Sequence, residues 1–172
     1  MGDIESMTSK SNKESEDRMD RTWLIGPASQ IEALQGRKHE VTLLPGTAKY
    51  KEVLNGYWSK QQAESQPSAI FQPRDAQDVA FAVGVLQRTR ASFAIKSGGH
   101  GRWLNESSCS DGILIDSHHM RHLELSEDRS SIRVGPGNRW KHVYGLLEPQ
   151  GLMAVGGRVA DVGVGGFLTS GR

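Results

Sequence analysis

The first half of the chain carries a strand–helix–strand pattern of apolar residues. Residues 67–73 form a short apolar run between two prolines, which predicts a strand. Asp75 can cap a helix that follows this strand. Apolar residues recur at helical spacing after the cap, at Val79, Val83 and Leu86. Residues 92–96 alternate as a second strand, and a strand–helix–strand of this length predicts a right-handed parallel crossover.

The pattern changes after a third strand. Residues 112–116 are apolar enough to lie in the centre of a sheet. Residues 123–134 read as a hairpin around a polar turn. Asn138 can cap a short helix that runs to Leu147, and residues 152–155 predict one more strand. The expected fold class is therefore α+β, with a parallel start and an antiparallel continuation.

Composition divides the chain into three parts. Residues 1–21 are rich in Ser, Lys, Glu and Asp without an apolar run, which predicts a disordered leader and no secretory signal. Residues 22–65 form an extension that we expect to pack on the domain, with a short helix over 25–34 and Trp58 as an apolar anchor. Residues 66–172 form the domain itself. A cytoplasmic location is expected, and the single cysteine agrees with it.

Charge and cysteine content exclude several classes of protein. The 21 Lys and Arg against 20 Asp and Glu give a formal charge of +1, which offers no general attraction to nucleic acid or to an anionic membrane. No apolar run approaches the ~18 residues of a membrane helix. The lone Cys109 cannot form an intrachain disulfide, and residues 118–122, with three histidines, read as a polar turn. We expect no nucleic-acid partner, no membrane and no metal.

Glycine is the informative residue. Of the 20 glycines, 14 lie from Gly98 onward, in clusters at the ends of apolar stretches. Backbone N–H groups of such loops can accept anionic oxygens, so the clusters indicate a phosphate-bearing ligand. The usual nucleotide fingerprints are absent, because Leu168 stands where G-x-G-x-x-G needs its last glycine. The alternative is that the loops only make tight turns.

Three side chains beside the glycines are candidates for chemistry. His100 lies inside a glycine loop, where it could act as an acid, a base or a nucleophile, or be an ordinary exposed loop histidine. Lys96 and Arg158 flank glycine pairs and could neutralise a pyrophosphate. Both could equally be surface cations at strand ends.

The order of five segments resembles a known family. Residues 93–101, 112–116, 132–140, 156–158 and 163–167 together resemble the FAD-linked oxidases with a p-cresol-methylhydroxylase-type (PCMH-type) FAD-binding domain. The nearest branch is the berberine-bridge-enzyme-like group, which includes many fungal oxidases of secondary metabolism. Several ordered motifs at family spacing are more specific than any single glycine loop.

The resemblance implies FAD as the cofactor and assigns residues to it. His100 matches the histidine that this branch joins covalently to the flavin 8α-methyl group, whereas Val159 stands where bicovalent members carry cysteine, so no cysteinyl link is expected. Gly99→Val is expected to block the ligand at little cost to the ligand-free fold. The residues expected to bind FAD are Lys96, Ser97, Gly98, Gly99, His100, Gly101, Gly157, Arg158, Gly163, Val164, Gly165, Gly166 and Phe167.

The resemblance also implies that the domain is truncated at its C-terminus, without the substrate domain and catalytic base. Catalytic residues are therefore unknown. The expected function is the FAD-binding part of an FAD-dependent oxidoreductase, which acts on a small organic substrate by hydride transfer to flavin. Two alternatives remain open at this point: a non-catalytic remnant of such an enzyme, and a small α/β nucleotide-binding module without flavin.

Overall fold

The computed structural model describes residues 27–170. The leader expected over residues 1–21 lies outside this range. The first described element is the helix α2 (Pro27–Lys38), which overlaps and extends the short helix expected over 25–34. The 3-10 turn η2 (His39–Val41) connects it to the sheet.

A four-stranded sheet has the order β1-β2-β4-β3. Its strands are β1 (Thr42–Leu43), β2 (Ala69–Phe71), β3 (Phe93–Lys96) and β4 (Ile113–Asp116). Both β2 and β3 pair in parallel with β4, so the predicted parallel relation of the first two strands and the central position of the third are confirmed. The short β1, which the sequence pattern did not predict, pairs antiparallel with β2.

The helix α5 (Ala76–Thr89) begins as predicted at Asp75. The Asp75 carboxylate accepts from the backbone N–H of Asp78 at 2.9 Å, and the Asp78 carboxylate accepts from the backbone N–H of Arg74 at 3.0 Å. These reciprocal bonds satisfy donors that a helix start otherwise leaves free. Asp78 also pairs with Lys38 Nζ at 2.8 Å, which ties α5 to α2.

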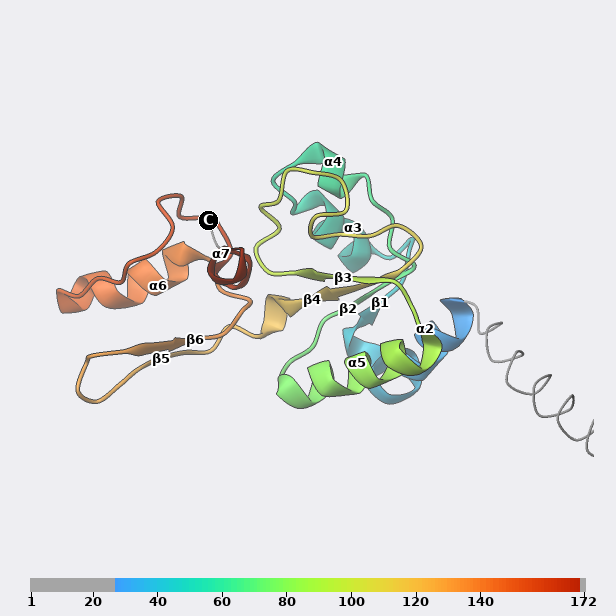
Figure 1. The fold of residues 1–172 in the computed structure, drawn as a ribbon, viewed down its shortest axis with the longest axis horizontal. Coiled ribbons are helices and arrows are strands. Elements are labelled where there is room, and N and C mark those ends of the chain that lie inside the picture. Colours follow the sequence, from blue (N-terminus) through green and yellow to red (C-terminus); the bar gives the residue numbers. More distant parts are fainter. Residues whose placement is uncertain (1–26, 171–172) are drawn as a thin grey trace, which may run out of the picture.

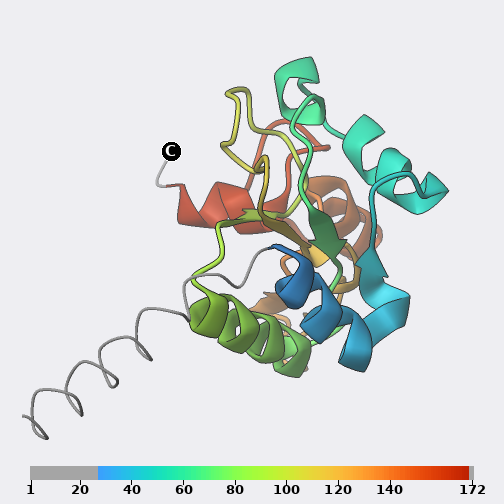
Figure 2. The same cartoon turned by 90° about the vertical axis from the view of Figure 1, so that its right-hand side faces the viewer.

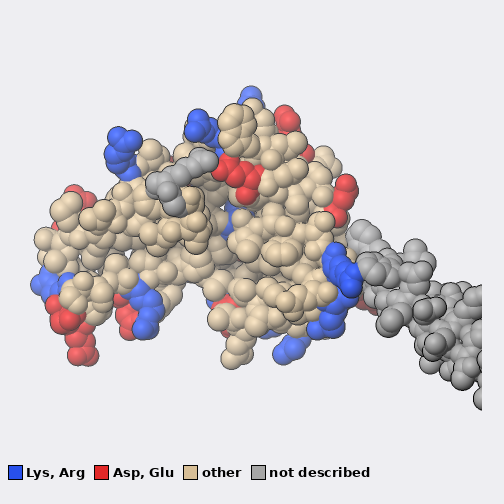
Figure 3. Space-filling view, viewed as in Figure 1, with Lys and Arg blue, Asp and Glu red and all other residues tan. Residues whose placement is uncertain are grey.

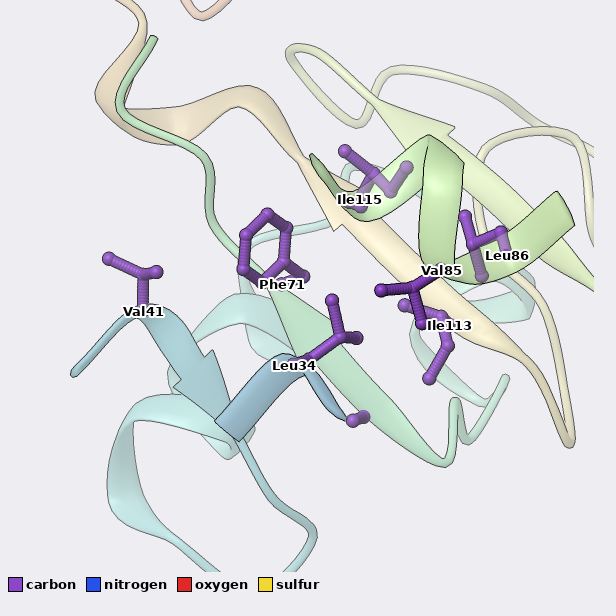
Figure 4. Close-up of a cluster of buried hydrophobic side chains, with 9 residues drawn as sticks. Leu34, Val41, Phe71, Val85, Leu86, Ile113 and Ile115 are labelled. Atoms are coloured by element: carbon purple, nitrogen blue, oxygen red, sulfur yellow. The ribbon is translucent and has the colours of Figure 1, made fainter. Parts of the chain in front are cut away.

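Alternate residues of the two central strands fill two cores. On one face, Phe71, Ile113 and Ile115 pack against residues of α2 and α5, including Leu34 and Val85 (Figure 4). On the other face, Ile70 and Leu114 pack against Leu43 and Tyr50. Because successive side chains of a strand point to opposite faces, both faces of β2 and β4 must be apolar to be buried.

Helices cover the two faces of the sheet separately. Figures 1 and 2 show α2 and α5 together on one face. The helices α3 (Ala48–Asn55) and α4 (Lys60–Ala63) lie on the other face. Thr47 caps α3, and the Tyr50 hydroxyl donates to the carbonyl of Pro67 at 2.7 Å. This bond fastens α3 to the chain just before β2.

A second lobe follows the sheet. The 3-10 turn η3 (Ser117–His119) leads into the hairpin of β5 (Leu123–Leu125) and β6 (Ile132–Val134), which confirms the predicted hairpin. The helix α6 (Trp140–Leu147), the turn η4 (Glu148–Gln150) and the helix α7 (Val164–Thr169) complete the lobe. It extends away from the sheet in Figure 1. Its own core consists of Trp140, Val143, Leu147 and Val164.

Two predictions for this lobe are wrong. Asn138 does not cap α6, because its side chain donates to the carbonyls of His122 at 3.1 Å and Gly135 at 3.0 Å. The cap position belongs to Arg139, whose backbone N–H donates to His142 Nδ1. Residues 152–155 form no strand. An extended run needs a neighbouring strand for its backbone hydrogen bonds, and none pairs with this run within residues 27–170.

The molecular surface carries charges of both signs. On the face drawn in Figure 3, Lys and Arg residues lie in several small groups apart from one another, and much of the remaining surface is uncharged. Among residues 27–170, no helix has the length and apolar character needed to cross a membrane.

Candidate functional site: a glycine-lined cavity between the sheet and the second lobe

Two glycine loops cross at the boundary between the sheet and the second lobe. A Cβ atom built on Gly98 would lie 2.5 Å from the backbone nitrogen of Gly163 and 2.6 Å from its Cα. Such distances are far below van der Waals contact, so no larger residue fits without moving one backbone. At Gly98 and Gly163, the close approach of the two chains is therefore enough to require glycine, as the alternative without a ligand expects.

Ser97 joins three of the glycine clusters. Its hydroxyl donates to the carbonyl of Pro136 at 2.6 Å and accepts from the backbone N–H of Gly165 at 3.2 Å. One side chain at the end of β3 therefore fixes the loop that follows the hairpin and the first turn of α7. These bonds bring together loops that are far apart in the sequence.

The loops line a cavity of about 1000 Å³. One side of it is apolar, with Ile95 and Ile115 from the sheet and Val79 and Val83 from α5. Because Ile95 and Ile115 are paired in the register of β3 and β4, their side chains project from the same face. The only charged side chain that lines the cavity among the described residues is that of Glu106.

Most of the residues expected to bind FAD line this cavity. They are Ser97, Gly98, Gly99, His100, Gly101, Gly163, Gly165, Gly166 and Phe167. The structure therefore brings both expected loops to one place. The lining contains no Lys or Arg among residues 27–170, so an anionic ligand there would have to be held by backbone amides. Two amides of the second loop are already bonded, since the N–H of Gly165 donates to Ser97 Oγ and that of Val164 donates to the Asn138 carbonyl.

Lys96 lies beneath the first loop instead of in the cavity. Its Nζ pairs with Asp116 Oδ1 at 3.2 Å, and Gln72 donates to the other carboxylate oxygen at 2.9 Å. The Lys96 side chain is only 8% exposed, so the interpretation of a surface cation is wrong. The signal in the sequence was an opposite charge at the same end of the neighbouring strand, since Lys96 and Asp116 are register partners.

The other three expected residues also lie outside the cavity lining. Gly157 packs beneath Trp140, whose Cδ1 would lie 2.6 Å from an added Cβ. Arg158 is exposed, and Val164 is buried in the core of the second lobe. Gly157 and Val164 therefore have roles in packing the second lobe.

Gly99 and Gly166 differ in the space that an added Cβ atom would find around it. Gly99 has φ +67°, and an added Cβ would lie 3.0 Å from Lys96 Cε and 3.1 Å from Tyr57 Cδ1. The expectation that Gly99→Val would cost the ligand-free fold little is therefore wrong, since a branched residue is strained at this φ. A Cβ on Gly166 would meet nothing within 4 Å, although Gly166 lines the cavity. Chain packing does not explain a glycine at that position of α7, whereas close approach of a ligand does.

His100 lies at the edge of the cavity. Its half-buried side chain lines both the main cavity and a neighbouring hollow of about 290 Å³. Trp58 lines the same hollow, a contact that its description as an apolar anchor missed. No group of three or more His, Cys, Asp or Glu residues within 27–170 could hold a metal ion.

Together, the mixed sheet and the glycine-lined cavity define a binding domain for a cofactor with anionic and apolar parts. The FAD binding domain family matches residues 67–172. The chain belongs to this family, of PCMH type, and its cofactor is FAD. The family match gives no support to a nucleotide-binding module without flavin.

Fungal flavoenzymes are similar to this chain in sequence. The FAD-dependent monooxygenase macF of Penicillium terrestre is 41% identical over 150 residues, which are 84% of this chain and 28% of that protein. The FAD-dependent monooxygenase tpcD of Cochliobolus heterostrophus is 33% identical over 167 residues, covering 86% and 32% of the two chains. The chain thus spans about a quarter to a third of the length of these relatives.

Solved structures share the fold. The 6-hydroxy-D-nicotine oxidase of Arthrobacter nicotinovorans matches with a TM-score of 0.63 and 23% identity, over 71% of this chain and 26% of that one. BBE-like 28 of Arabidopsis thaliana matches with a TM-score of 0.58 and 19% identity, over 64% and 24%. The predicted resemblance to PCMH-type flavin domains with berberine-bridge-like neighbours is confirmed.

Proposed function

We propose that this chain is the FAD-binding part of an FAD-dependent oxidoreductase that acts on a small organic substrate. The cavity between the two glycine loops carries the proposal, because it offers backbone donors on one side and an apolar wall on the other. Bound FAD supplies a two-electron acceptor for oxidation of the substrate. A cytoplasmic location, which agrees with the single cysteine, and the absence of a nucleic-acid partner belong to the same proposal.

The two sides of the cavity suit different parts of FAD. Backbone N–H groups of the loop at Gly98–Gly101, and those of the second loop that are not already bonded to Ser97 or Asn138, suit the anionic pyrophosphate. The wall formed by Val79, Val83 and Ile95 suits an apolar ring. Lys96, although expected to meet the pyrophosphate, supports the first loop from below through its pair with Asp116.

His100 is the proposed point of covalent attachment to the flavin 8α-methyl group. Attachment exchanges one imidazole N–H bond and one methyl C–H bond for a C–N bond. Two protons and two electrons are released, and dioxygen is the final electron acceptor. A cysteinyl link is not part of the proposal, since Val159 stands at the corresponding position.

Gly166→Ala tests the proposed cavity without disturbing the chain. A methyl group at Gly166 meets no protein atom within 4 Å but enters the cavity lining, so we expect FAD affinity to fall by at least about ten-fold. The free energy of unfolding without FAD should stay the same or rise, because alanine favours the helix. Flavin fluorescence titration and urea unfolding measure the two quantities in the protein expressed at the full length of its gene.

Gly145→Ala is the matched control. Gly145 is also an exposed helical glycine whose added Cβ would meet nothing within 4 Å, but it lies in α6 outside the cavity lining. Gly145→Ala should leave FAD affinity unchanged. Equal FAD affinity in Gly166→Ala and the wild type would contradict the proposed site.

His100→Ala tests the covalent bond. We expect acid-precipitable flavin in the wild type and none in His100→Ala. Acid-precipitable flavin that persists in His100→Ala would refute the attachment point.

A further inference from the structure

Trp58 is an exposed aromatic residue that stacks on the ring of His100. Its side chain is 61% exposed, although burying an indole is strongly favourable. The ring stacks on the imidazole of His100, with centroids 4.8 Å apart and an interplanar angle of 16°. The tryptophan therefore covers one face of the histidine that borders the cavity.

Three successive residues fasten this indole to the histidine loop. Residues 57–59 precede the segment matched by the family, yet each makes a hydrogen bond to residues 99–107. Burial raises the pKa of Tyr57 above its ordinary value, so its hydroxyl is a neutral donor. The bonds run from the Tyr57 hydroxyl to the Ser107 carbonyl at 2.7 Å, from the Trp58 backbone N–H to the Gly99 carbonyl at 3.1 Å, and from the Ser59 hydroxyl to the Arg102 carbonyl at 3.0 Å.

The stack limits how the imidazole of His100 can turn. The ring forms part of the wall between the main cavity and the smaller hollow, so its plane determines which edge faces each space. A stacked indole favours ring planes parallel to its own and disfavours rotation out of the stack. We propose that Trp58 is a positioning residue for His100, which holds the imidazole plane so that one ring nitrogen faces the main cavity.

The inference rests on the proposed covalent attachment at His100 and adds a residue outside the matched family segment. A misplaced nucleophile slows bond formation far more than it weakens binding, because the reacting atoms need close alignment. Removal of the indole should therefore separate the rate of attachment from the affinity for FAD. A purely structural role for Trp58 would change both together with the melting temperature.

The first test observes the stack in the protein without FAD. The ring protons of His100, assigned by comparison with His100→Gln in NMR spectra, should be shifted upfield by the indole ring current. The shift should disappear in Trp58→Ala and remain in part in Trp58→Phe. Trp103→Ala is the matched control, since Trp103 is likewise an exposed tryptophan, 68% exposed, and lies on the loop that carries His100. Identical His100 shifts in the wild type and Trp58→Ala would overturn the inference.

The second test measures flavin attachment in the protein expressed at the full length of its gene. After FAD is added to apoprotein, we expect acid-precipitable flavin to form about ten- to a hundred-fold more slowly in Trp58→Ala. The FAD dissociation constant should stay within about two-fold, Trp58→Phe should recover part of the rate, and Trp103→Ala should behave as wild type.

The outcomes separate the two proposals. Attachment in Trp58→Ala at the wild-type rate would overturn the positioning role and leave the attachment point intact. A loss of FAD affinity and melting temperature in parallel with the rate would also overturn it, in favour of a structural role. Absence of acid-precipitable flavin in the wild type would instead refute the attachment on which the inference rests.

Discussion

The sheet and the second lobe differ in how completely each buries its own apolar residues. Ile70, Phe71, Ile113 and Leu114 in the two central strands have no exposed surface, because helices cover both faces of the sheet. In the second lobe, β5 and β6 are only partly buried, and Val155 is fully exposed. Each part therefore has a core of its own, but the sheet buries its apolar residues more completely than the second lobe does.

This difference affects the cavity directly. One glycine loop belongs to the sheet and the other to the second lobe, and the two touch through Gly98, Gly163 and the hydroxyl of Ser97. The apolar wall of the cavity is part of the sheet, while Gly166 and Phe167 belong to the second lobe. Ligand binding should thus be more sensitive to the junction than global stability is.

The largest effect is expected for Phe71→Ala in the sheet. Phe71 belongs to the central strand β2 and is fully buried against residues of α2 and α5, so its replacement by alanine should lower the free energy of unfolding by about 3–5 kcal/mol. Urea unfolding followed by far-UV circular dichroism measures the change. Phe93→Ala, at a half-exposed position of the edge strand, is the control and should cost much less. Equal losses would contradict the claim that the sheet holds a closed core.

A smaller loss is expected for Gly98→Ala at the junction. The added methyl group overlaps the backbone of Gly163, and such overpacking costs about 1–3 kcal/mol. The FAD affinity should fall as well, because the two loops must separate. Gly36→Ala is the control, since an added Cβ there meets nothing within 4 Å. If Gly98→Ala changed neither the free energy of unfolding nor the FAD affinity, the two loops would not approach each other as closely as the structure shows.

The sheet was the more predictable region because its signals are local. The apolar runs of β2 and β4 and the cap at Asp75 lie within a few residues of the elements that they form. In the second lobe, the apolar run over residues 152–155 predicted a strand, but a strand forms only with a partner. An apolar run alone carries no information about that partner.

The site was predictable only as far as its glycine loops. Their sequence indicated an anion-binding cavity, but it could not separate Gly98, which serves packing, from Gly166, which leaves open space. The buried pair of Lys96 with Asp116 and the stack of Trp58 on His100 join residues at least 20 positions apart. Such contacts depend on strand register and loop placement, which follow from the complete fold.

The ion pair of the buried Asp78 ties α2 to α5 and gives the sheet a pH dependence. The second lobe also has carboxyl groups of lowered pKa, those of Glu124, Asp128 and Asp161, but all three are exposed. Burial alone would raise the pKa of Asp78, but hydrogen bonds from Lys38 and from the Arg74 backbone outweigh it, so the net pKa is below the ordinary value. The stabilisation is present above the unfolded-state pKa of about 4 and is lost as pH falls through the lower folded-state pKa.

Asp78→Asn should therefore lower the free energy of unfolding by about 1–2 kcal/mol at pH 7 and by less near pH 3. Urea unfolding at both pH values measures the difference. Asp111→Asn, at an exposed loop position, is the control. A loss in Asp78→Asn that is equal at pH 7 and pH 3 would show that the charge of Asp78 does not contribute.

The smallest effect is expected for Val155→Ser in the second lobe. A valine in a buried strand would lose apolar packing on this substitution and leave a polar hydroxyl in the core. Val155 is instead fully exposed, so the free energy of unfolding should change by less than about 0.5 kcal/mol. Val143→Ser in the same lobe is the control, because Val143 is fully buried against Trp140 and should show a large loss. A large loss in Val155→Ser would mean that residues 152–155 are covered in solution, and the second lobe would then bury its apolar residues nearly as well as the sheet does.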